Sequence, residues 1–217
     1  AKYRNFFKQF YDLRENGQYR LYKNKINNLY EILKPRCKHE PIETIHCDIA
    51  AALQETLEII VFHILSFYKE KTDHKRLCMA GGVAQNSRLN GKILMSGFFD
   101  KMFVQPASND SGCAVGAALM VAYELDNLLN KSALTQVYWG TEVGSNEQIQ
   151  VVLQQWTDVI SFTRSTDTAQ EAAQLLADNY VIGWVQDAAE FGPRALGNRS
   201  ILGNPCYESN KQLINKM

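Results

Sequence analysis

The stretch from Leu77 to Asn86 most constrains the fold, because an apolar run ends there in two adjacent glycines and a helix-compatible segment, 83–95, follows at once. A strand that delivers its carboxyl end into a Gly-Gly turn before a helix presents backbone N–H groups to a phosphate. Glycine permits both the positive φ of such a turn and the close approach of a ligand. Many strand-to-helix turns carry glycine for packing alone, so nucleotide binding is a hypothesis at this point.

A second strand–loop–helix unit follows the first. The predicted elements are strands at 76–80 and 101–106 and helices at 83–95 and 113–129. This alternation is typical of an α/β domain with at least part of a parallel sheet, in which ligands bind at the carboxyl ends of the strands. We therefore expect Gly81 and Gly82 to face the same cleft as Asn109 and Asp110.

The first part of the chain shows helical spacing of apolar residues at 6–13 and again at 22–33, with a turn at Asn16 and Gly17 between them. A long amphipathic helix is then predicted over 49–68, with Asp48 as its N-cap and a core-facing stripe of Ile and Leu.

The composition changes after the small-residue helix, and we interpret 134–146 as a linker between two domains, 1–133 and 147–217. The second domain is predicted to begin with helices at 147–156 and 168–179 and a strand at 181–186. Ser145 or Asn146 is the expected cap of the first of these helices.

The stretch 190–202 packs two arginines, Arg194 and Arg199, among glycines, and it is too irregular for a plain helix. The planar fork of arginine matches the paired oxygens of phosphate and carboxylate groups. Structural ion pairs, with Glu190 as the nearest partner, explain the same residues equally well. Spacing alone leaves both hypotheses open.

The formal net charge is zero and 21% of residues are charged, which argues against a non-specific nucleic-acid surface but allows an anionic small molecule. Five scattered cysteines, mostly in apolar segments, predict packed thiols in a reducing compartment. The longest apolar run, 59–67, is too short to span a bilayer. No signal peptide is visible, and both ends suggest a piece excised from a longer protein.

Four residues of metal-ligating type fall within eleven positions, namely Cys37, His39, His46 and Cys47. Their spacing contains no paired half-site that would hold a tetrahedral ion, so surface-loop residues are the favoured interpretation. His63, on the long helix, is interpreted as a partly buried structural histidine.

Several of these segments together resemble the nodulation-type O-carbamoyltransferases. The matching segments are 80–86, 103–106 with Asp110 and Gly112, 116–119, and the long and specific stretch 190–202. Weaker similarity covers the helix after Asp48 and the residues Tyr138, Trp139 and Gly140. The resemblance extends over most of the chain from about residue 40.

The resemblance implies a two-part cytoplasmic enzyme. Its first domain would have the acetate kinase/sugar kinase/Hsp70/actin (ASKHA) superfold, and its second would be YrdC-like. Carbamoyl phosphate and ATP would give a carbamoyl-adenylate, and a hydroxyl of a small metabolite would accept the carbamoyl group with help from a divalent metal ion, Fe or Zn. The α/β chain would then hold the latter part of the first domain and the start of the second. No nucleic-acid or membrane partner is expected, and a homodimer is one option.

The resemblance also implies site residues. Gly81, Gly82 and Asn86 would bind the nucleotide, Asp110 would be a metal ligand, and Arg194, Arg199 and Ser200 would bind phosphates or the carbamoyl group. Guanidinium groups suit this task because the transferring and leaving oxygens carry charge that must be neutralised.

Two departures from the family pattern stand out. None of the four histidines matches the histidine pair of the family's metal site, and Asp187, Ala188 and Ala189 stand where the family has Gly-Arg-Met. The fragment alone is therefore expected to be inactive. The alternatives are an enzyme of the tRNA threonylcarbamoyl-forming branch, which the 190–202 stretch disfavours, and a nucleotide-binding scaffold that has lost catalysis.

Overall fold

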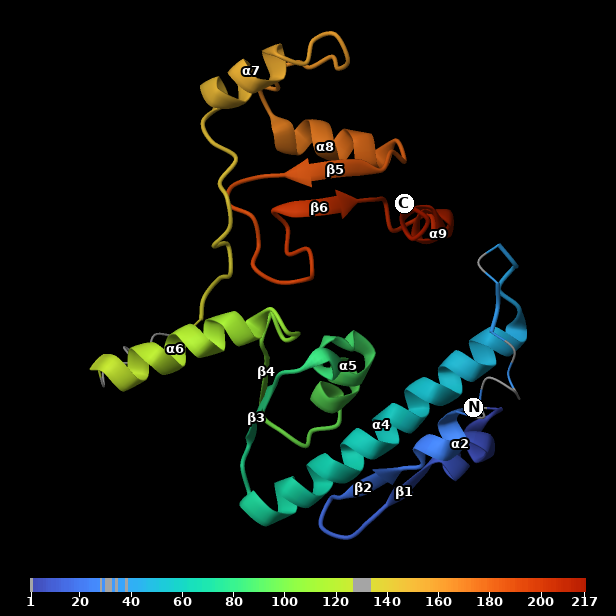
Figure 1. Cartoon of the computed structure of the whole chain (residues 1–217). Coiled ribbons are helices and arrows are strands. Elements are labelled where there is room, and N and C mark those ends of the chain that lie inside the picture. Colours follow the sequence, from blue (N-terminus) through green and yellow to red (C-terminus); the bar gives the residue numbers. More distant parts are fainter. Residues whose placement is uncertain (1, 28, 30–32, 34, 38, 127–133) are drawn as a thin grey trace. The chain divides into compact units, whose positions relative to one another are not determined.

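The computed structural model describes residues 2–27, 29, 33, 35–37, 39–126 and 134–217. The chain forms two compact units. Unit 1 comprises Ala1–Met79 and Asn86–Val104, and unit 2 comprises Ala80–Gln85 and Gln105–Met217. Both units combine helices with small two-stranded sheets (Figure 1), so the α/β class predicted from the sequence is confirmed.

Unit 1 begins with short elements around a hairpin. They are α1 (Arg4–Phe7), the 3-10 helix η1 (Lys8–Phe10), strands β1 (Tyr11–Leu13) and β2 (Tyr19–Leu21), and α2 (Lys23–Asn27). Asn16 and Gly17 form the expected turn, with φ of 60° and 68°. The prediction of a helix over 6–13 is wrong beyond residue 10, because the chain that this turn reverses pairs with itself as antiparallel strands. The predicted helix over 22–33 ends at Asn27, and part of its remainder lies outside the described residues.

Helix α4 (Thr44–Thr72) begins earlier than predicted, and Glu43 rather than Asp48 is its N-cap. The Glu43 side chain accepts a hydrogen bond from the backbone of His46, and His46 Nδ1 accepts the Glu43 N–H at 2.9 Å. This reciprocal capping box satisfies two backbone amide groups at the start of the helix, which explains why α4 begins before Asp48.

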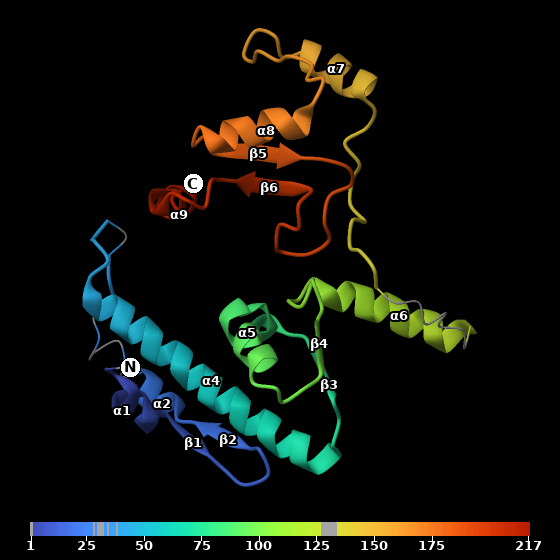
Figure 2. The ribbon, with the colours of Figure 1, turned by 180° about the vertical axis from the view of Figure 1, so that it is seen from behind.

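The core of unit 1 lies between α4 and the N-terminal elements that run beside it (Figure 2). It is centred on the buried side chains of Phe7, Phe10 and Ala52. His63 on α4 donates from Nε2 to the carbonyl oxygens of Arg14 and Gln18, at 2.8 and 3.0 Å, which confirms its structural role.

By length and composition, α4 is the one helix among the described residues that could cross a membrane, and core helices of globular domains pass the same test. The sequence predicts that the apolar run 59–67 is too short to span a bilayer, but the helix that contains this run, α4, has 29 residues. Its predicted apolar stripe is only partly buried, since Ile60 is 8% exposed but Leu53 is 56% exposed.

Strands β3 (Arg76–Met79) and β4 (Lys101–Val104) pair in parallel, as predicted, with Met79 opposite Val104. The single helix predicted over 83–95 is instead two elements, a 3-10 turn η2 (Gly82–Gln85) and helix α5 (Ser87–Met95). Asn86 interrupts them because its extended backbone makes it the N-cap of α5.

Unit 2 contains helices α6 (Gly112–Asp126), α7 (Asn146–Gln154), α8 (Thr168–Ala177) and α9 (Glu208–Ile214), with strands β5 (Ile182–Val185) and β6 (Arg199–Leu202). Helix α8 lies alongside β5 (Figures 1 and 2). Ser145 caps α7 through a capping box with Gln148, as the sequence predicted. Strand β6 was not predicted, and it pairs antiparallel with β5. The end of the helix predicted over 113–129 lies outside the described residues.

All five cysteines are exposed and free, so the prediction of packed thiols is wrong. Cys78 shows the reason: successive residues of β3 point to opposite faces, and the face that carries Cys78 is exposed.

Candidate functional site

The glycine loop (residues 80–85) follows β3 and adopts the conformation that its sequence suggested. Gly81 has a φ of 92°, in the region that favours glycine. Its N–H donates to the carbonyl oxygen of Ser108 at 2.6 Å. Within unit 2, the glycine loop therefore lies against the loop that contains Asn109 and Asp110, as the sequence predicted.

The space around the two glycines is open. A Cβ added at Gly81 or Gly82 would meet no heavy atom of the described residues within 4 Å. Gly81 is needed for its positive φ, but neither backbone conformation nor packing against the described residues requires glycine at position 82. The arrangement leaves room for a ligand to approach the backbone closely.

The glycine loop also holds a polar group that sequence reasoning missed. The side-chain Nε2 of Gln85 is buried and has no hydrogen-bond partner among the described residues. Buried donors are normally paired, so a donor left over at this loop suits an acceptor on a ligand. A lone Gln in a motif gives no sequence indication of this role.

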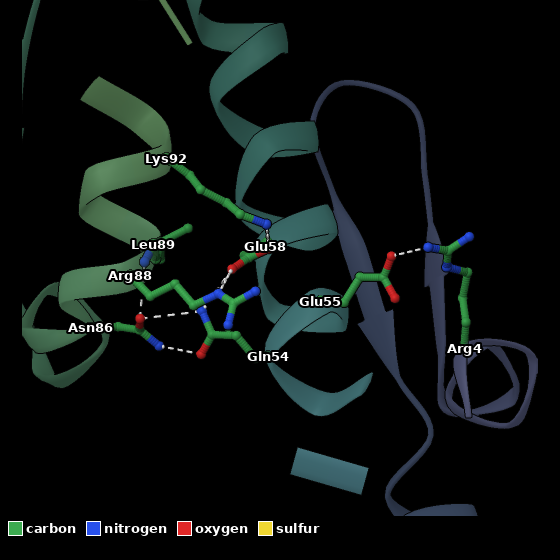
Figure 3. A network of polar contacts seen from close by, with 8 residues as sticks. All are labelled: Arg4, Gln54, Glu55, Glu58, Asn86, Arg88, Leu89 and Lys92. Carbon is green, nitrogen blue, oxygen red and sulfur yellow. Dashed lines mark hydrogen bonds and ion pairs between the residues drawn. The ribbon is translucent and has the colours of Figure 1, made fainter. Parts of the chain in front are cut away.

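Asn86 is fully engaged within unit 1 (Figure 3). Its Oδ1 accepts from the Leu89 N–H at 3.0 Å and from Gln54 Nε2 at 3.2 Å, and its Nδ2 donates to Gln54 Oε1 at 2.8 Å. The predicted nucleotide contact of Asn86 stays a prediction. The role that the bonds give it is to cap α5 and join it to α4.

A buried carboxylate continues the same line of polar contacts on α4 (Figure 3). Glu58 is 5% exposed, accepts from Gln54 Nε2 at 2.9 Å and from the Lys92 ammonium, and lies 3.5 Å from Arg88 Nε. Burial acts to raise the pKa of Glu58, but the hydrogen bonds from Lys92 and Gln54 outweigh it and lower the pKa. The ionised carboxylate thus holds α5 against α4.

Asp110 lies exposed in a tight turn before α6. Its carbonyl oxygen accepts the Cys113 N–H at 3.0 Å, and the Asn109 carbonyl accepts the Gly112 N–H at 3.0 Å. Across the part of the chain that the structure describes, no group of three or more His, Cys, Asp or Glu residues could hold a metal ion. One carboxylate does not make a metal site, so the ligand role of Asp110 stays a prediction.

The second candidate site is the signature loop (residues 190–198). Oε1 of Glu190 accepts three backbone N–H groups, from Leu196 and Asn198 at 2.8 Å and from Arg199 at 3.1 Å. Partial desolvation acts to raise the pKa of Glu190, but these backbone hydrogen bonds outweigh it and lower the pKa to about 2. The carboxylate is therefore the centre around which the loop folds.

The guanidinium of Arg199 is bonded to backbone carbonyl groups. It donates to the oxygens of Gln186 at 2.7 Å, Asn198 at 2.8 Å, Thr141 at 3.1 Å and Asp187 at 3.2 Å. Within the described residues it forms no ion pair with Glu190, so the alternative that this carboxylate pairs with Arg199 is wrong. The carboxylate binds amide groups, and the guanidinium binds carbonyl groups.

Arg194 differs from Arg199 in both its exposure and its hydrogen bonds. It is exposed near the tip of the signature loop, and it makes no hydrogen bond or ion pair within the part of the chain that is described. Ser200 lies half-buried on β6, opposite Trp184. Of the three residues predicted to bind phosphate or carbamoyl groups, only Arg194 presents an uncommitted charge.

Both loops lie in segments that match known protein families. A carbamoyltransferase N-terminus family model matches residues 2–119, and a carbamoyltransferase C-terminus model matches residues 173–217. The chain belongs to the carbamoyltransferase family. The glycine loop and Asp110 fall within the first match, and the signature loop falls within the second.

Curated relatives of this carbamoyltransferase-family chain include nodulation proteins. It is 49% identical to nodulation protein NolNO of Sinorhizobium fredii over 216 residues, which cover 99% of this chain and 32% of the relative. It is 48% identical to NolO of Bradyrhizobium diazoefficiens over 215 residues, covering 99% and 39%. Nodulation protein U of the same species is 28% identical over 222 residues, covering 96% and 37%. The chain thus spans about a third of the length of these relatives.

Proposed function

We propose that this chain is part of an ATP-dependent O-carbamoyltransferase with an ASKHA-type domain followed by a YrdC-like domain. Water would release inorganic phosphate from carbamoyl phosphate, and the resulting carbamate would attack the α-phosphorus of ATP to give a carbamoyl-adenylate and pyrophosphate. The carbamoyl group would then pass to a hydroxyl of a small metabolite, with AMP as leaving group. Membership of the carbamoyltransferase family supports the reaction class.

The proposal rests on the difference between the hydrogen-bond partners of the two arginines. Arg199 is bonded to four carbonyl groups and serves the loop, whereas Arg194 is exposed and without a partner in the described residues. A free guanidinium on a fixed loop can donate hydrogen bonds to two oxygens of a phosphate or carbamoyl phosphate group. Such a cation neutralises charge that develops on the transferring and leaving oxygens.

The glycine loop supports nucleotide binding. The open space at Gly82 and the unpaired Nε2 of Gln85 fit a ligand that approaches the backbone and offers an acceptor. We propose that Gly81, Gly82 and Gln85 line part of the nucleotide site, and Asn86, which follows them in the chain, caps α5. For the metal ion, the described residues contain no group of three or more His, Cys, Asp or Glu that could hold it, and Asp110 is the one ligand that the resemblance implies, so we derive no step through it.

The test uses the full-length protein that contains this chain, and it measures pyrophosphate release from ATP that depends on carbamoyl phosphate. Arg194→Ala is expected to lower the rate by about 100-fold or more, the scale for removing one preorganised donor to a transition-state oxygen. Arg194→Lys keeps the positive charge but loses the planar guanidinium fork, so its rate should lie between those of the unchanged protein and Arg194→Ala. Arg164→Ala, at another exposed arginine of unit 2, is the matched control and should leave the rate unchanged.

Two results would contradict the proposal. If the full-length protein releases no pyrophosphate or AMP but binds ATP, the non-catalytic nucleotide-binding alternative gains support. If it is active and Arg194→Ala has no effect, the signature loop does not contact the reacting groups.

A further inference from the structure

We propose that residues 137–142, here called the bracing segment, position the signature loop, with Tyr138 as the positioning residue. The inference rests on the proposed function of Arg194. The bracing segment lies outside both family-model matches, 2–119 and 173–217. The sequence predicts that this segment is part of a linker, and only Tyr138, Trp139 and Gly140 show weaker family similarity there.

Backbone hydrogen bonds join the bracing segment to the start of the signature loop and the residues before it. The Phe191 N–H donates to the Val137 oxygen at 2.7 Å, and the Gly140 N–H donates to the Ala189 oxygen at 2.9 Å. The Ala189 N–H in turn donates to the Thr141 oxygen at 3.0 Å. Val137 is buried, and the rings of Trp139 and Phe191 are 5.8 Å apart. These contacts make the bracing segment part of the same local structure as the loop.

One side chain of the bracing segment reaches the far end of the loop. The Tyr138 hydroxyl donates to the carbonyl oxygen of Leu196 at 3.0 Å. The Leu196 N–H donates to Glu190 Oε1 at 2.8 Å. Leu196 is therefore fixed through both of its backbone polar groups, two positions after Arg194.

Arg199, at the base of the loop, joins the bracing segment to the residues before the loop through its guanidinium. Its Nη2 donates to Thr141 of the bracing segment and to Asp187, while its Nη1 donates to Gln186 and Asn198. Asn198 is 3% exposed, and its Nδ2 donates to the Ala188 oxygen at 2.8 Å. The base and the far end of the loop are thus both anchored to residues 137–142.

The consequence concerns Arg194. No partner within the described residues holds its side chain, so the position of its backbone sets the region that its guanidinium can reach. That backbone lies between Glu190 and Leu196, and Tyr138 anchors Leu196. Preorganised charge acts on a transition state only when it is held in place beforehand. Tyr138 should therefore support catalysis through Arg194 without touching the substrate.

The experiment is a double-mutant cycle in the full-length protein, with Tyr138→Phe, Arg194→Ala and the double variant. The readout is kcat/KM for pyrophosphate release that depends on carbamoyl phosphate. Tyr138→Phe deletes one hydroxyl and is expected to lower kcat/KM by about 3- to 10-fold, the scale of one hydrogen bond. On the Arg194→Ala background it should have no further effect, because the two residues act as one unit. Tyr180→Phe is the matched control, since the Tyr180 hydroxyl makes no hydrogen bond within the described residues and its side chain is 60% exposed.

The outcomes separate this inference from the proposed function. If the full-length protein releases no pyrophosphate, the proposed function fails; if it is active and Arg194→Ala leaves the rate unchanged, the proposed role of Arg194 fails, and in either case the inference falls with it. If Arg194→Ala impairs the rate but Tyr138→Phe does not, or if the two effects multiply, the positioning role alone is overturned. Faster hydrogen exchange at the Leu196 amide in Tyr138→Phe, with no change in Tyr180→Phe, would add support that is independent of activity.

Discussion

Asn86 and Gln54 exchange two amide hydrogen bonds, from Gln54 Nε2 to Asn86 Oδ1 at 3.2 Å and from Asn86 Nδ2 to Gln54 Oε1 at 2.8 Å (Figure 3). The same Oδ1 accepts the Leu89 N–H and so caps α5. One side chain therefore both begins α5 and attaches it to α4. Within unit 1, Asn86 therefore fixes the start of α5 against α4.

Replacement of Asn86 tests this double role. Asn86→Ala removes the cap and the pair, and should destabilise α5 by about 1–2 kcal/mol. Asn86→Asp keeps an acceptor for the Leu89 N–H and should be much milder. The measurement is hydrogen exchange of the Leu89 amide in the full-length protein. Equal acceleration in both variants would mean that capping is not the main contribution of Asn86.

The local parts of this fold could be predicted because their causes are local. The strands β3 and β4 and the cap at Ser145 follow from short-range patterns of apolar, turn and capping residues. The helical spacing at 6–13 misled because Phe and Tyr at such positions also suit a hairpin packed on a helix.

The candidate site could be predicted only in part, for a physical reason. Sequence pattern located the glycine loop and the arginines, but it could not tell which arginine is free. Arg199 is held by carbonyl groups as distant in sequence as Thr141, and Tyr138 reaches Leu196 across 58 positions. Such contacts depend on tertiary structure, and the acceptors are backbone atoms that every residue carries.

Gly82 offers a clean test of nucleotide binding. Gly82→Ala adds a methyl group to space that the described residues leave open, so the fold should be preserved. If ATP approaches this backbone, its affinity for the full-length protein should fall by about tenfold or more, as measured by calorimetry. Gly91→Ala, in the interior of α5 and also in open space, is the control and should stabilise the helix by about 0.5–1 kcal/mol without changing affinity. Unchanged ATP affinity in Gly82→Ala would exclude close approach at this position.

The signature loop should depend on pH through Glu190. Backbone hydrogen bonds lower its pKa from 4.5 to about 2 in the folded state, against the opposing effect of desolvation. A carboxyl group whose pKa is lowered by folding stabilises the fold above its ordinary pKa and loses that contribution as the pH falls. Loop protection should thus decline between about pH 4.5 and pH 2, as followed by the Glu190 carboxyl resonance and by Leu196 amide exchange. Glu190→Gln should weaken the exchange protection of the loop already at neutral pH. A measured Glu190 pKa at or above 4.5 would contradict the three backbone hydrogen bonds to its carboxylate.

Gly140 should be intolerant of any side chain, because the bracing segment approaches the residues before the signature loop most closely there. A Cβ at position 140 would lie 2.9 Å from the Ala189 Cβ and 3.0 Å from the Ala189 carbonyl oxygen. That oxygen already accepts the Gly140 N–H at 2.9 Å, so the backbone cannot move away without breaking the pairing. Gly140→Ala is therefore expected to destabilise this region by about 1–3 kcal/mol, the usual cost of overpacking.

The matched control for Gly140 is Gly183→Ala on β5, where an added Cβ meets no atom of the residues that the structure describes within 4 Å. Hydrogen exchange at the Gly140, Ala189 and Phe191 amides should accelerate together in Gly140→Ala and stay unchanged in Gly183→Ala. Because the same contacts anchor the backbone that carries Arg194, pyrophosphate release should fall with them. Preserved exchange protection in Gly140→Ala would show that residues 137–142 can shift without loosening the loop, and the close approach would then have no structural consequence.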